Sequence, residues 1–408
     1  MRIALISDIH FGAMSTTTEL AVHGEPLQIG EVQKASPLFQ GLINVLKKEK
    51  PEYLFIAGDL TSSGSPLEFK YCYQKMHQLG SEVGIKPANM VFCLGNHDID
   101  WRISELVDSY TLKPGATYLS DDIAYLKSNY CRLAYSWPVQ TSDPISQKYS
   151  SKYSTPLTGV IEHDDCVIFI LNSGHLCTHD QEHKHGCLSD LQLEWFKEVV
   201  QQYNQTTKVK IVLLHHHPFN YPYPLTGLDI STLEEGSELL QLCGEKGVDL
   251  VLHGHRHHPK AQTIFHTGWV KPVTYVCSGS LSVNASHRLQ GSIPNTFHII
   301  EYKNYDQIIL SNYSYKPATG WSLTLNNCPE TPIDGKMRLG KIIDDETAIK
   351  HIRDLPKNQP IKYQSLSDDL MYLSLKKLNE LVVSVHGKDN EIFNDFPKDV
   401  IIYSHREV

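Results

Sequence analysis

Residues 248–258 read VDLVLHGHRHH, a stretch that joins a strand pattern to a cluster of histidines. Its first half is an apolar segment of the length expected for a strand buried on both faces. Gly254 follows, and after it come His255 and His257, which are two residues apart. Ligands of open α/β sheets bind outside the carboxyl ends of the strands. The stretch therefore predicts a buried strand whose end presents imidazoles to a binding site.

The same strand pattern occurs five times before this stretch. The earlier apolar segments span residues 2–7, 53–58, 90–95, 166–172 and 210–215. Helical patterns lie between the strands, at about residues 31–49, 66–80, 189–203 and 231–246. In the third of these, Ser189 is a good N-cap and apolar residues follow at helical spacing. Strands that alternate with helices predict an α/β domain.

Two parts of the chain interrupt this alternation. Residues from about 101 to 158 are rich in Tyr, Ser and Pro without a clear period, which predicts a long insertion of the kind that forms lids or binding loops. Further along, residues 295–302 and 307–315 predict an antiparallel pair of strands that closes a sheet. We therefore expect a first domain over residues 1–315 and a small C-terminal accessory region, of open role, over residues 316–408.

The composition predicts a soluble protein. Hydrophobic residues make up 41% of the 408 residues and charged residues 20%, which suits a chain with a sizeable core. The formal net charge of −9 argues against a strongly basic nucleic-acid surface. No segment reaches the roughly 18 apolar residues of a membrane span, and the apolar run at the N-terminus is too short for a signal peptide. The nine cysteines are scattered singly, so a reducing, cytoplasmic location without membrane contact is expected.

Nearly every predicted strand ends in side chains that can bind metal ions. Besides His255 and His257, the strand ends carry Asp8, His10, Asp59, Asn96 and His215. Carboxylate, carboxamide and imidazole ligands without a thiolate suit divalent Mn²⁺, Fe²⁺ (or its oxidised form Fe³⁺) or Zn²⁺. Seven candidate ligands are too many for one ion and fit two ions that share a carboxylate. Two such ions can hold a hydroxide between them and clamp a phosphoryl group.

The ordered motifs around these residues are D-x-H, G-D, G-N-H-D, H-x-x-P and G-H-x-H, and all five are intact. This set resembles that of the calcineurin-like metallophosphoesterases over roughly residues 1–310. In addition, residues 186–200 and 211–218, GCLSDLQLEWFKEVV and IVLLHHHP, look like the corresponding helix and strand of the bacterial cyclic-nucleotide phosphodiesterase branch. The resemblance implies a four-layer α/β/β/α sandwich and a metal-bridging hydroxide that attacks phosphorus.

The resemblance also implies a role for each motif residue. One metal ion would be held by Asp8, His10 and His257, and a second by Asn96, His215 and His255, with Asp59 bridging the two. His97 would contact the phosphate and protonate the leaving oxygen, a step typically worth about 10²–10⁴-fold in rate. Asp98 would orient His97 as its carboxylate partner.

Other residues near the motifs have open roles. His217 is a tentative substrate contact, although packing explains His216 and His217 equally well. His253 is expected to be a structural residue at a strand end, and His258 a residue on the rim of the site. Arg256 is expected to point away from the metals, because it lies between two inward-facing histidines.

Residues 174–187, GHLCTHDQEHKHGC, form a second histidine-rich segment that follows a predicted strand. A substrate-contacting rim is favoured here, with His175 as a tentative contact. A separate zinc site and a plain exposed loop are the alternatives. Asp100, Trp101 and Arg102, which directly follow the G-N-H-D motif, are further candidates to border the site.

These observations predict a metal-dependent phosphoric ester hydrolase and favour a phosphodiester substrate such as a cyclic or linear nucleotide. A DNA nuclease is an alternative, in which the C-terminal region grips DNA, but the net acidity counts against it. A phosphomonoesterase acting on proteins or small molecules is another. A metal-binding scaffold without catalysis is least favoured, because no motif residue is missing. The native metals and the oligomeric state stay open.

Overall fold

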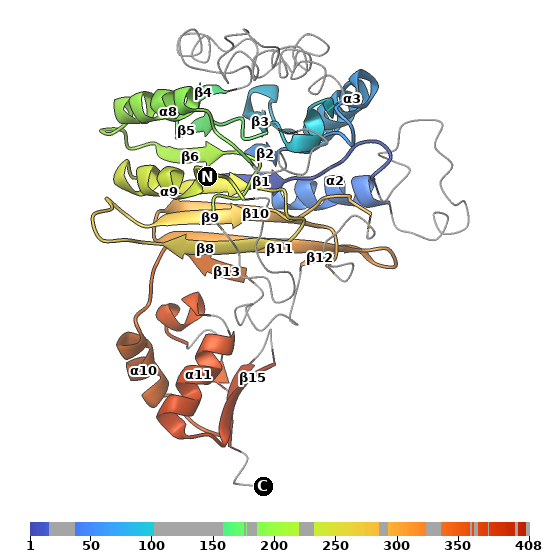
Figure 1. Cartoon of the computed structure of the whole chain (residues 1–408). Coiled ribbons are helices and arrows are strands. Elements are labelled where there is room, and N and C mark those ends of the chain that lie inside the picture. The colour runs from blue at the N-terminus through green and yellow to red at the C-terminus, as the bar shows by residue number, and fades with distance from the viewer. Residues whose placement is uncertain are drawn as a thin grey trace. The chain divides into compact units, whose positions relative to one another are not determined.

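The structure is a computed structural model, and it describes residues 1–15, 37–101, 158–174, 177, 186–219, 232–284, 293–323, 336–359, 361–362, 366–373, 375–395 and 399–404. The chain divides into two compact units, whose elements are labelled in Figure 1. The first unit comprises Met1–Ile299 and Tyr313–Ser322, and the second comprises Ile300–Asn312 and Leu323–Val408. All the candidate metal ligands lie in the first unit.

Three parallel strands form one half of the first sheet. They are β1 (Arg2–Ile6), β2 (Tyr53–Ala57) and β3 (Met90–Cys93). Their side chains are almost all buried, as the continuous apolar segments predict for strands covered on both faces. Beyond β1 the sheet continues through β10 (Thr296–Asn304), β11 (Gln307–Lys316) and β12 (Gly320–Leu323), and β13 (Lys336–Leu339) pairs with β11.

The second sheet has a parallel centre and two antiparallel edge strands. Its order is β4 (Gly159–Glu162), β5 (Cys166–Ile170), β6 (Val209–Leu213), β7 (Leu250–His253), β9 (Val273–Cys277) and β8 (Lys260–Ile264). β5, β6, β7 and β9 are parallel, whereas β4 and β8 are antiparallel to their neighbours. The carboxyl ends of the parallel strands therefore meet at one edge of this sheet.

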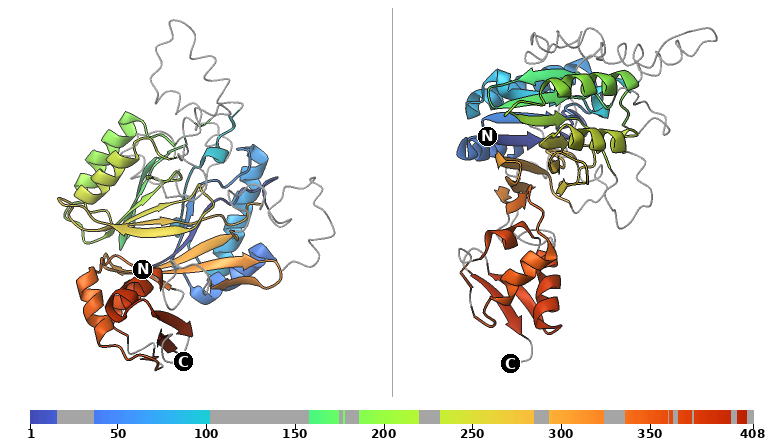
Figure 2. Two further views of the ribbon diagram at one scale, coloured as in Figure 1. Left: turned by 60° about the horizontal axis from the view of Figure 1, so that its bottom comes forward. Right: turned by 90° about the vertical axis from the view of Figure 1, so that its left-hand side faces the viewer.

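Helices cover the outer face of each sheet. α2 (Leu38–Glu49) and α3 (Pro66–Val83) pack on the first sheet, and α8 (Asp190–Gln202) and α9 (Gly236–Glu245) pack on the second. Figure 2 (left) shows the two helix pairs on opposite sides of the sheets. The predicted α/β fold, with two sheets between outer helices, is confirmed.

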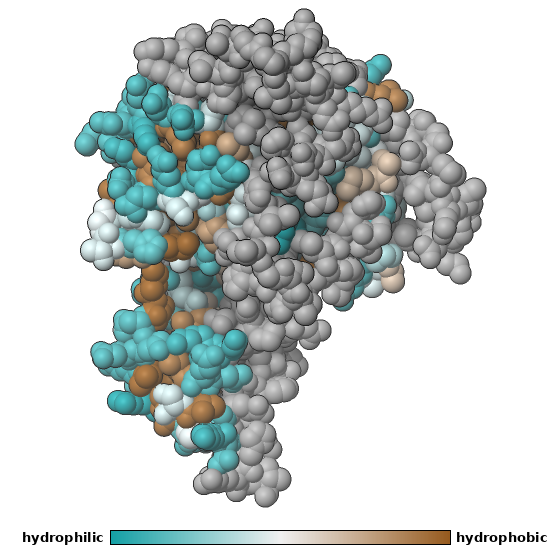
Figure 3. Space-filling model, viewed as in Figure 1, coloured by the Kyte–Doolittle hydropathy of each residue, from teal (hydrophilic) through white to brown (hydrophobic). Residues whose placement is uncertain are grey.

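The helix boundaries follow local signals in the sequence. Ser189 Oγ accepts a hydrogen bond from the backbone N–H of Gln192, so the predicted N-cap of α8 is confirmed. Ser65 caps α3 in the same way, with Pro66 in the first turn. The polar side of α8 faces outward, and hydrophilic residues cover that part of the surface in Figure 3. No helix in the described part of the chain combines the length and hydrophobicity that a membrane span requires.

The second unit has its own hydrophobic core. A three-stranded antiparallel sheet has the order β14 (Ile361–Lys362), β16 (Asp399–Ser404) and β15 (Asn390–Asp395). The helices of this unit are α10 (Asp345–Arg353), the 3₁₀ turn η6 (Asp368–Tyr372) and α11 (Leu375–His386). Ile352, Leu378 and Val382 are among the buried residues that join them.

The predicted strands and helices agree closely with the structure. Each of the six predicted strands occurs, with bounds that differ by at most two residues. The predicted closing pair corresponds to β10 and β11, which are neighbours in the first sheet. Most of the predicted insertion, residues 102–157, lies outside the described residues, as do residues 31–36 of the first predicted helix. β4, β8 and β9 of the second sheet were not predicted, and neither were β12 to β16.

A buried histidine in β10 is expected to make stability depend on pH. His298 is 2% exposed, and its Nε2 lies 3.0 Å from the carbonyl oxygen of Cys277. Burial lowers the pKa of His298 from 6.5 to about 4. The unfolded chain therefore binds a proton that the folded chain does not, between these two pH values. The part of the free energy of unfolding that depends on His298 therefore keeps its full value above pH 6.5. It falls as the pH drops toward 4, by up to about 3 kcal/mol.

The variant His298→Gln keeps a hydrogen-bond donor but removes this titration. The free energy of unfolding in urea should fall between pH 7 and pH 5 by about 2 kcal/mol more in the parent protein than in the variant. An identical pH dependence in both proteins would show that His298 does not contribute.

Candidate metal centre

The seven candidate ligands lie at the carboxyl ends of strands from both sheets. Asp8 and His10 follow β1, Asp59 follows β2, Asn96 follows β3 in the 3₁₀ turn η2 (Asn96–Asp98), His215 follows β6, and His255 and His257 follow β7. The two edges are tied together, since the N–H of Leu281, after β9, donates to the carbonyl oxygen of Ser7. The strand ends that carry the ligands therefore belong to two sheets.

Four of the ligand-type side chains form a first group. His10 Nε2 lies 3.4 Å from Asp59 Oδ2 and 3.8 Å from Asp8 Oδ1. His257 Nε2 lies 3.1 Å from Asp8 Oδ1. All four ligand atoms are within 4.8 Å of one another. Two atoms bound to one ion at about 2.1 Å are roughly 3–4 Å apart, so this spacing suits a single ion.

A second group shares Asp59 with the first. His215 Nε2 lies 3.3 Å from Asp59 Oδ2, and His255 completes the cluster. Asn96 Oδ1 is 3.1 Å from His215 Nε2 and 3.1 Å from His255 Nδ1. Asp59 Oδ2 thus faces both groups, which is the position expected for a bridging carboxylate.

Hydrogen bonds turn one oxygen of each carboxylate toward the centre. Asp59 Oδ1 accepts from the backbone N–H of His97 at 2.8 Å, which leaves Oδ2 to face the histidines. Asp8 Oδ2 lies 2.5 Å from Ser7 Oγ and accepts a hydrogen bond from the N–H of His255 at 3.1 Å. The other oxygen, Oδ1, is left to face the centre. These outer contacts orient the ligands in the manner typical of metal sites.

The tautomer of His215 is fixed by the same kind of contact. Its Nδ1 lies 2.7 Å from the carbonyl oxygen of Ala57. Because a carbonyl oxygen only accepts, Nδ1 carries the hydrogen of the neutral ring, whose Nε2 then has its lone pair toward Asp59 and Asn96. The ring therefore presents a metal-binding nitrogen to the centre.

The backbone of the ligand residues is strained. Among the described residues, seven that are not glycine have positive φ, and five of them are candidate ligands: Asp8 (52°), His10 (47°), Asp59 (50°), His255 (77°) and His257 (52°). Such conformations typically cost of order 1–3 kcal/mol each and persist where the surrounding structure enforces them. This concentration marks the strand ends as a functional site.

Glycines of the motifs let the segments approach closely. A Cβ on Gly254 would lie 1.8 Å from Ser7 Oγ and 2.7 Å from Asp8 Oδ2, and one on Gly95 would lie 2.2 Å from Asp59 Oδ1. Any side chain at these positions would displace the hydrogen bonds that orient the two carboxylates. The G-H-x-H and G-N-H-D motifs therefore need their glycines for packing around the ligands.

The variant Gly254→Ala is expected to lose metal affinity and about 1–3 kcal/mol of stability, because the new methyl group overlaps Ser7 and Asp8. Metal content per chain and denaturant unfolding measure the two effects. Gly84→Ala is the matched control, since that glycine ends α3 with φ of 83° and has open space around it. The control should lose stability but keep its metal, and an equal loss of metal in both variants would refute the steric explanation.

The charges of the centre favour cation binding. Burial acts to raise the pKa of the Asp8 and Asp59 carboxyls, but the neighbouring imidazoles outweigh it and hold both below their usual range. Burial lowers the pKa of His10 to about 4 and that of His255 well below its ordinary value. For His215 burial also opposes the proton, yet the charges of Asp59 and Asp8 outweigh it and raise the pKa to about 9. Metal ions binding here would replace that proton.

Buried polar atoms at the centre fit metal ligation. Asp8 Oδ1 and both ring nitrogens of His10 are buried and have no hydrogen-bond partner within the described part of the chain. Buried polar atoms normally have partners, and unmet ones at a cluster of ligands are explained by ions that would bind there. The oxygen and nitrogen donors suit two divalent cations of the Mn²⁺, Fe²⁺ or Zn²⁺ kind.

His97 stands at the edge of this centre. Its ring is 4.8 Å from the His10 ring, centroid to centroid, in an edge-to-face arrangement. Its Nδ1 lies 3.1 Å from the carbonyl oxygen of Ser62, so Nδ1 carries a hydrogen and Nε2 is the nitrogen that can act on a substrate.

Asp98 is buried behind His97. One carboxylate oxygen accepts from the N–H and hydroxyl of Thr61, and the other accepts from the N–H of Gly95. Burial, followed by the charge of Asp59, raises the pKa of Asp98 to about 7. These bonds tie the loop after β2 to the G-N-H-D turn. The role of Asp98 as the carboxylate partner of His97 stays a prediction.

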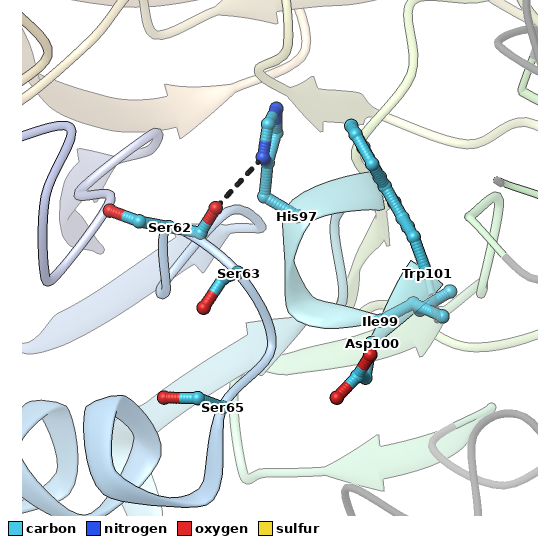
Figure 4. A pocket seen from close by; sticks show the side chains of 7 residues that line it. All are labelled: Ser62, Ser63, Ser65, His97, Ile99, Asp100 and Trp101. Carbon is cyan, nitrogen blue, oxygen red and sulfur yellow. Dashed lines mark hydrogen bonds between the residues drawn. The ribbon is translucent and has the colours of Figure 1, made fainter. Parts of the chain in front are cut away.

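A cavity of about 270 Å³ opens beside His97. The described residues that line it are Ser62, Ser63, Ser65, His97, Ile99, Asp100 and Trp101 (Figure 4). Asp100 and Trp101, which were expected to border the site, line this cavity; Arg102 lies outside the described residues. The three serines were not predicted, because they lie in the loop after β2 and belong to no motif.

The other histidines near the motifs lie in different surroundings. The His217 ring lies 5.9 Å from the His255 ring and 6.5 Å from that of His253, and both His217 and His253 are fully buried. His216 Nδ1 lies 3.0 Å from Ser173 Oγ, which favours a structural role. His258 Nδ1 lies 3.1 Å from the carbonyl oxygen of Pro259.

The second histidine-rich segment is described only at Gly174, Cys177, Gly186 and Cys187; His175 lies outside the described residues. Cys187 forms a cluster of ligand-type atoms with Glu234 and Glu235. Glu235 already accepts hydrogen bonds from the Cys187 thiol and the N–H of Leu188. These bonds hold the segment against the loop before α9.

The model of the family described as calcineurin-like phosphoesterase matches residues 1–259. The chain belongs to this family. The resemblance inferred from the five motifs is thereby confirmed, and the calcineurin-like phosphoesterase is a metal-dependent hydrolase of phosphoric esters. The family uses a dinuclear metal centre, in agreement with the two groups that share Asp59.

Three solved structures are among those to which this chain is similar. A dimetal phosphatase from Danio rerio is 10% identical, with 79% of this chain and 98% of the other covered and a TM-score of 0.48. A purple acid phosphatase from yellow lupin, Lupinus luteus, is 12% identical over 79% of this chain and 52% of its own, with a TM-score of 0.45. A phosphoesterase from E. coli is 13% identical over 76% and 91%, with a TM-score of 0.31. No curated protein sequence gives a significant match.

Proposed function

We propose that this chain is a binuclear metal-dependent phosphodiesterase. The observation that carries the proposal is the position of Asp59 Oδ2, which lies 3.4 Å from His10 Nε2 in one ligand group and 3.3 Å from His215 Nε2 in the other. One ion would be held by Asp8, His10 and His257, the other by Asn96, His215 and His255, and Asp59 would bridge them. When bound, the two ions supply the nucleophile and neutralise charge on the phosphoryl group.

His97 is proposed as the general acid. Ser62 holds its Nδ1, so a protonated ring directs Nε2–H toward the leaving oxygen. Asp98 holds the G-N-H-D turn in place through Gly95 and Thr61. His217 and His175 are proposed as substrate contacts.

The preference for a diester has two supports. The first is the likeness of residues 186–200 and 211–218 to the cyclic-nucleotide phosphodiesterase branch. The second is charge: a diester carries one negative charge and a monoester about two. The described residues that line the cavity beside His97 include Asp100 and neither Lys nor Arg. A nucleotide is therefore proposed as the substrate class, ahead of a nucleic acid strand.

The test compares bis-p-nitrophenyl phosphate with p-nitrophenyl phosphate in Mn²⁺ and after chelation. We expect metal-dependent turnover with a higher kcat/KM for the diester. A higher kcat/KM for the monoester would establish a phosphatase instead. Absence of turnover in a protein shown to hold its metals would favour the scaffold alternative.

The cellular location and the domain division stay proposals. A cytoplasmic location is supported by the seven described cysteines, all of which are free thiols. The division into residues 1–315 and an accessory region at 316–408 is supported by the weaker sequence signal of the C-terminal part.

A further inference from the structure

The cavity beside His97 is placed to receive part of the substrate. The His97 ring lies 4.8 Å from the His10 ring on the side of the metal centre and 5.0 Å from the Trp101 ring on the side of the cavity. An oxygen that His97 protonates must lie within hydrogen-bond distance of its Nε2. Because His97 also lines the cavity, the carbon skeleton attached to that oxygen can enter it. This inference rests on the proposed function.

Trp101 gives the cavity a rigid flat wall. Its Nε1 donates a hydrogen bond of 2.8 Å to the carbonyl oxygen of Asn96, which fixes the indole. Figure 4 shows the His97 and Trp101 rings rising next to each other, with Ile99 and Asp100 at the base of Trp101. A fixed aromatic ring is a surface on which flat groups stack and cationic groups bind.

The opposite wall consists of serines that can hydrogen-bond to a ligand. Ser63 Oγ donates to Glu68 Oε2 at 2.9 Å and retains its lone pairs as acceptors. Ser65 Oγ accepts from the N–H of Glu68 at 3.2 Å, so its own hydrogen can be donated. The cavity thus combines one aromatic wall with one hydroxyl wall, as sites for small polar organic groups commonly do.

The charge of the cavity disfavours leaving groups that are anionic. Asp100 is an anion among the lining residues, and the described ones include no Lys or Arg. An anionic group placed a few ångströms from Asp100 would be repelled in this partly enclosed space. A leaving group that carries a phosphate or carboxylate is therefore disfavoured.

We propose that this cavity binds the leaving alcohol of the phosphodiester and that Trp101 is its main contact. The alcohols selected are those without negative charge that present a flat or cationic group to the indole. Nucleosides and amino alcohols share this chemistry. Trp101 is then a specificity-determining residue that decides which of the two ester bonds is cleaved.

The test uses adenosine 5′-methyl phosphate and choline methyl phosphate with the Mn²⁺-loaded protein. In each diester the phosphate joins methanol to a larger alcohol, so the products report which alcohol left. We expect adenosine and choline to be released with methyl phosphate. Trp101→Ala should lower kcat/KM by about tenfold and shift the products toward methanol release. Release of methanol by the parent protein would overturn the proposal.

Two further variants show whether Trp101 contacts the alcohol directly or acts only by positioning Asn96. Trp101→Phe loses the hydrogen bond to Asn96 but keeps a ring, so it should retain the product pattern of the parent protein. If it behaves like Trp101→Ala, the effect arises from Asn96 and the proposal is wrong. Phe265→Ala removes a 48% exposed aromatic residue outside the cavity and should change neither products nor rate.

Asp100→Asn distinguishes the two kinds of alcohol. A fall in kcat/KM for the choline ester alone identifies an amino alcohol, whereas an unchanged kcat/KM for both esters, with adenosine still released, identifies a nucleoside. Failure to hydrolyse any diester, with two ions bound, would overturn the proposed function itself rather than the assignment of Trp101.

Discussion

Replacing Asp59 by alanine is expected to abolish binding of both metal ions and to lower kcat/KM for a diester by roughly 10³-fold or more. The reason is that Asp59 Oδ2 faces both ligand groups, at 3.4 Å from His10 Nε2 and 3.3 Å from His215 Nε2. Without this carboxylate, each group loses a negative ligand and neither is left with more than three side chains. Metal content per chain by elemental analysis and steady-state kinetics measure the two effects.

A buried aspartate outside the centre provides the control for Asp59→Ala. Asp249 is 2% exposed, accepts from the N–H of Lys210, and forms an ion pair with Lys271. Asp249→Asn should therefore lower stability while the chain keeps two ions. Asp59→Asn retains an acceptor for the N–H of His97 and tests the charge alone. Two ions per chain in Asp59→Ala would contradict the bridging role.

The sequence predicted the strand ends because strong local signals coincide there. A continuous apolar segment predicts a strand with both faces covered, and the polar residues directly after it must lie at the carboxyl end. Asp8 after β1 and His255 after β7 are examples. The order of the five motifs indicated the family. The family in turn implied that residues so far apart in the sequence lie close together in the fold.

The hydrogen bonds that orient the ligands could not be predicted in this way. Ala57 and Ser62 act through their backbone carbonyl oxygens, and any residue type supplies that group. The positive φ of Asp8 and Asp59 is equally hidden, because it results from the packing of one loop on another. Only the glycines gave a signal, since Gly95 and Gly254 are part of the motifs.

Two of the strands that the sequence missed, β4 and β8, form the edges of the second sheet. β8 reads KAQTI, all five of its residues are only partly buried, and it forms an edge of the second sheet. β4 reads GVIE and has four residues. A strand as short as β4 or as mixed as β8 gives a weak local pattern, so pairing with a neighbour, rather than the local sequence, determines it.

Replacing His97 by alanine is expected to leave both metal ions bound and to slow the hydrolysis of alkyl esters by about 10²–10⁴-fold. The expectation follows from the position of His97 beside His10, and from the hydrogen bond of Nδ1 to the Ser62 carbonyl, which leaves Nε2 for the leaving oxygen. An alkoxide needs a proton to leave, whereas p-nitrophenolate leaves readily without one. The loss for bis-p-nitrophenyl phosphate should therefore be much smaller.

This dependence on the leaving group separates proton transfer from structural damage. If His97→Ala merely disturbed the turn that carries Asn96 and Asp98, rates for alkyl and p-nitrophenyl esters would fall together and metal content would drop. A general acid gives the opposite result: two ions per chain, a large loss for the alkyl ester and a small loss for the aryl ester. Unchanged turnover of the alkyl ester by His97→Ala would exclude the assignment, since no other change in that variant compensates for a missing proton.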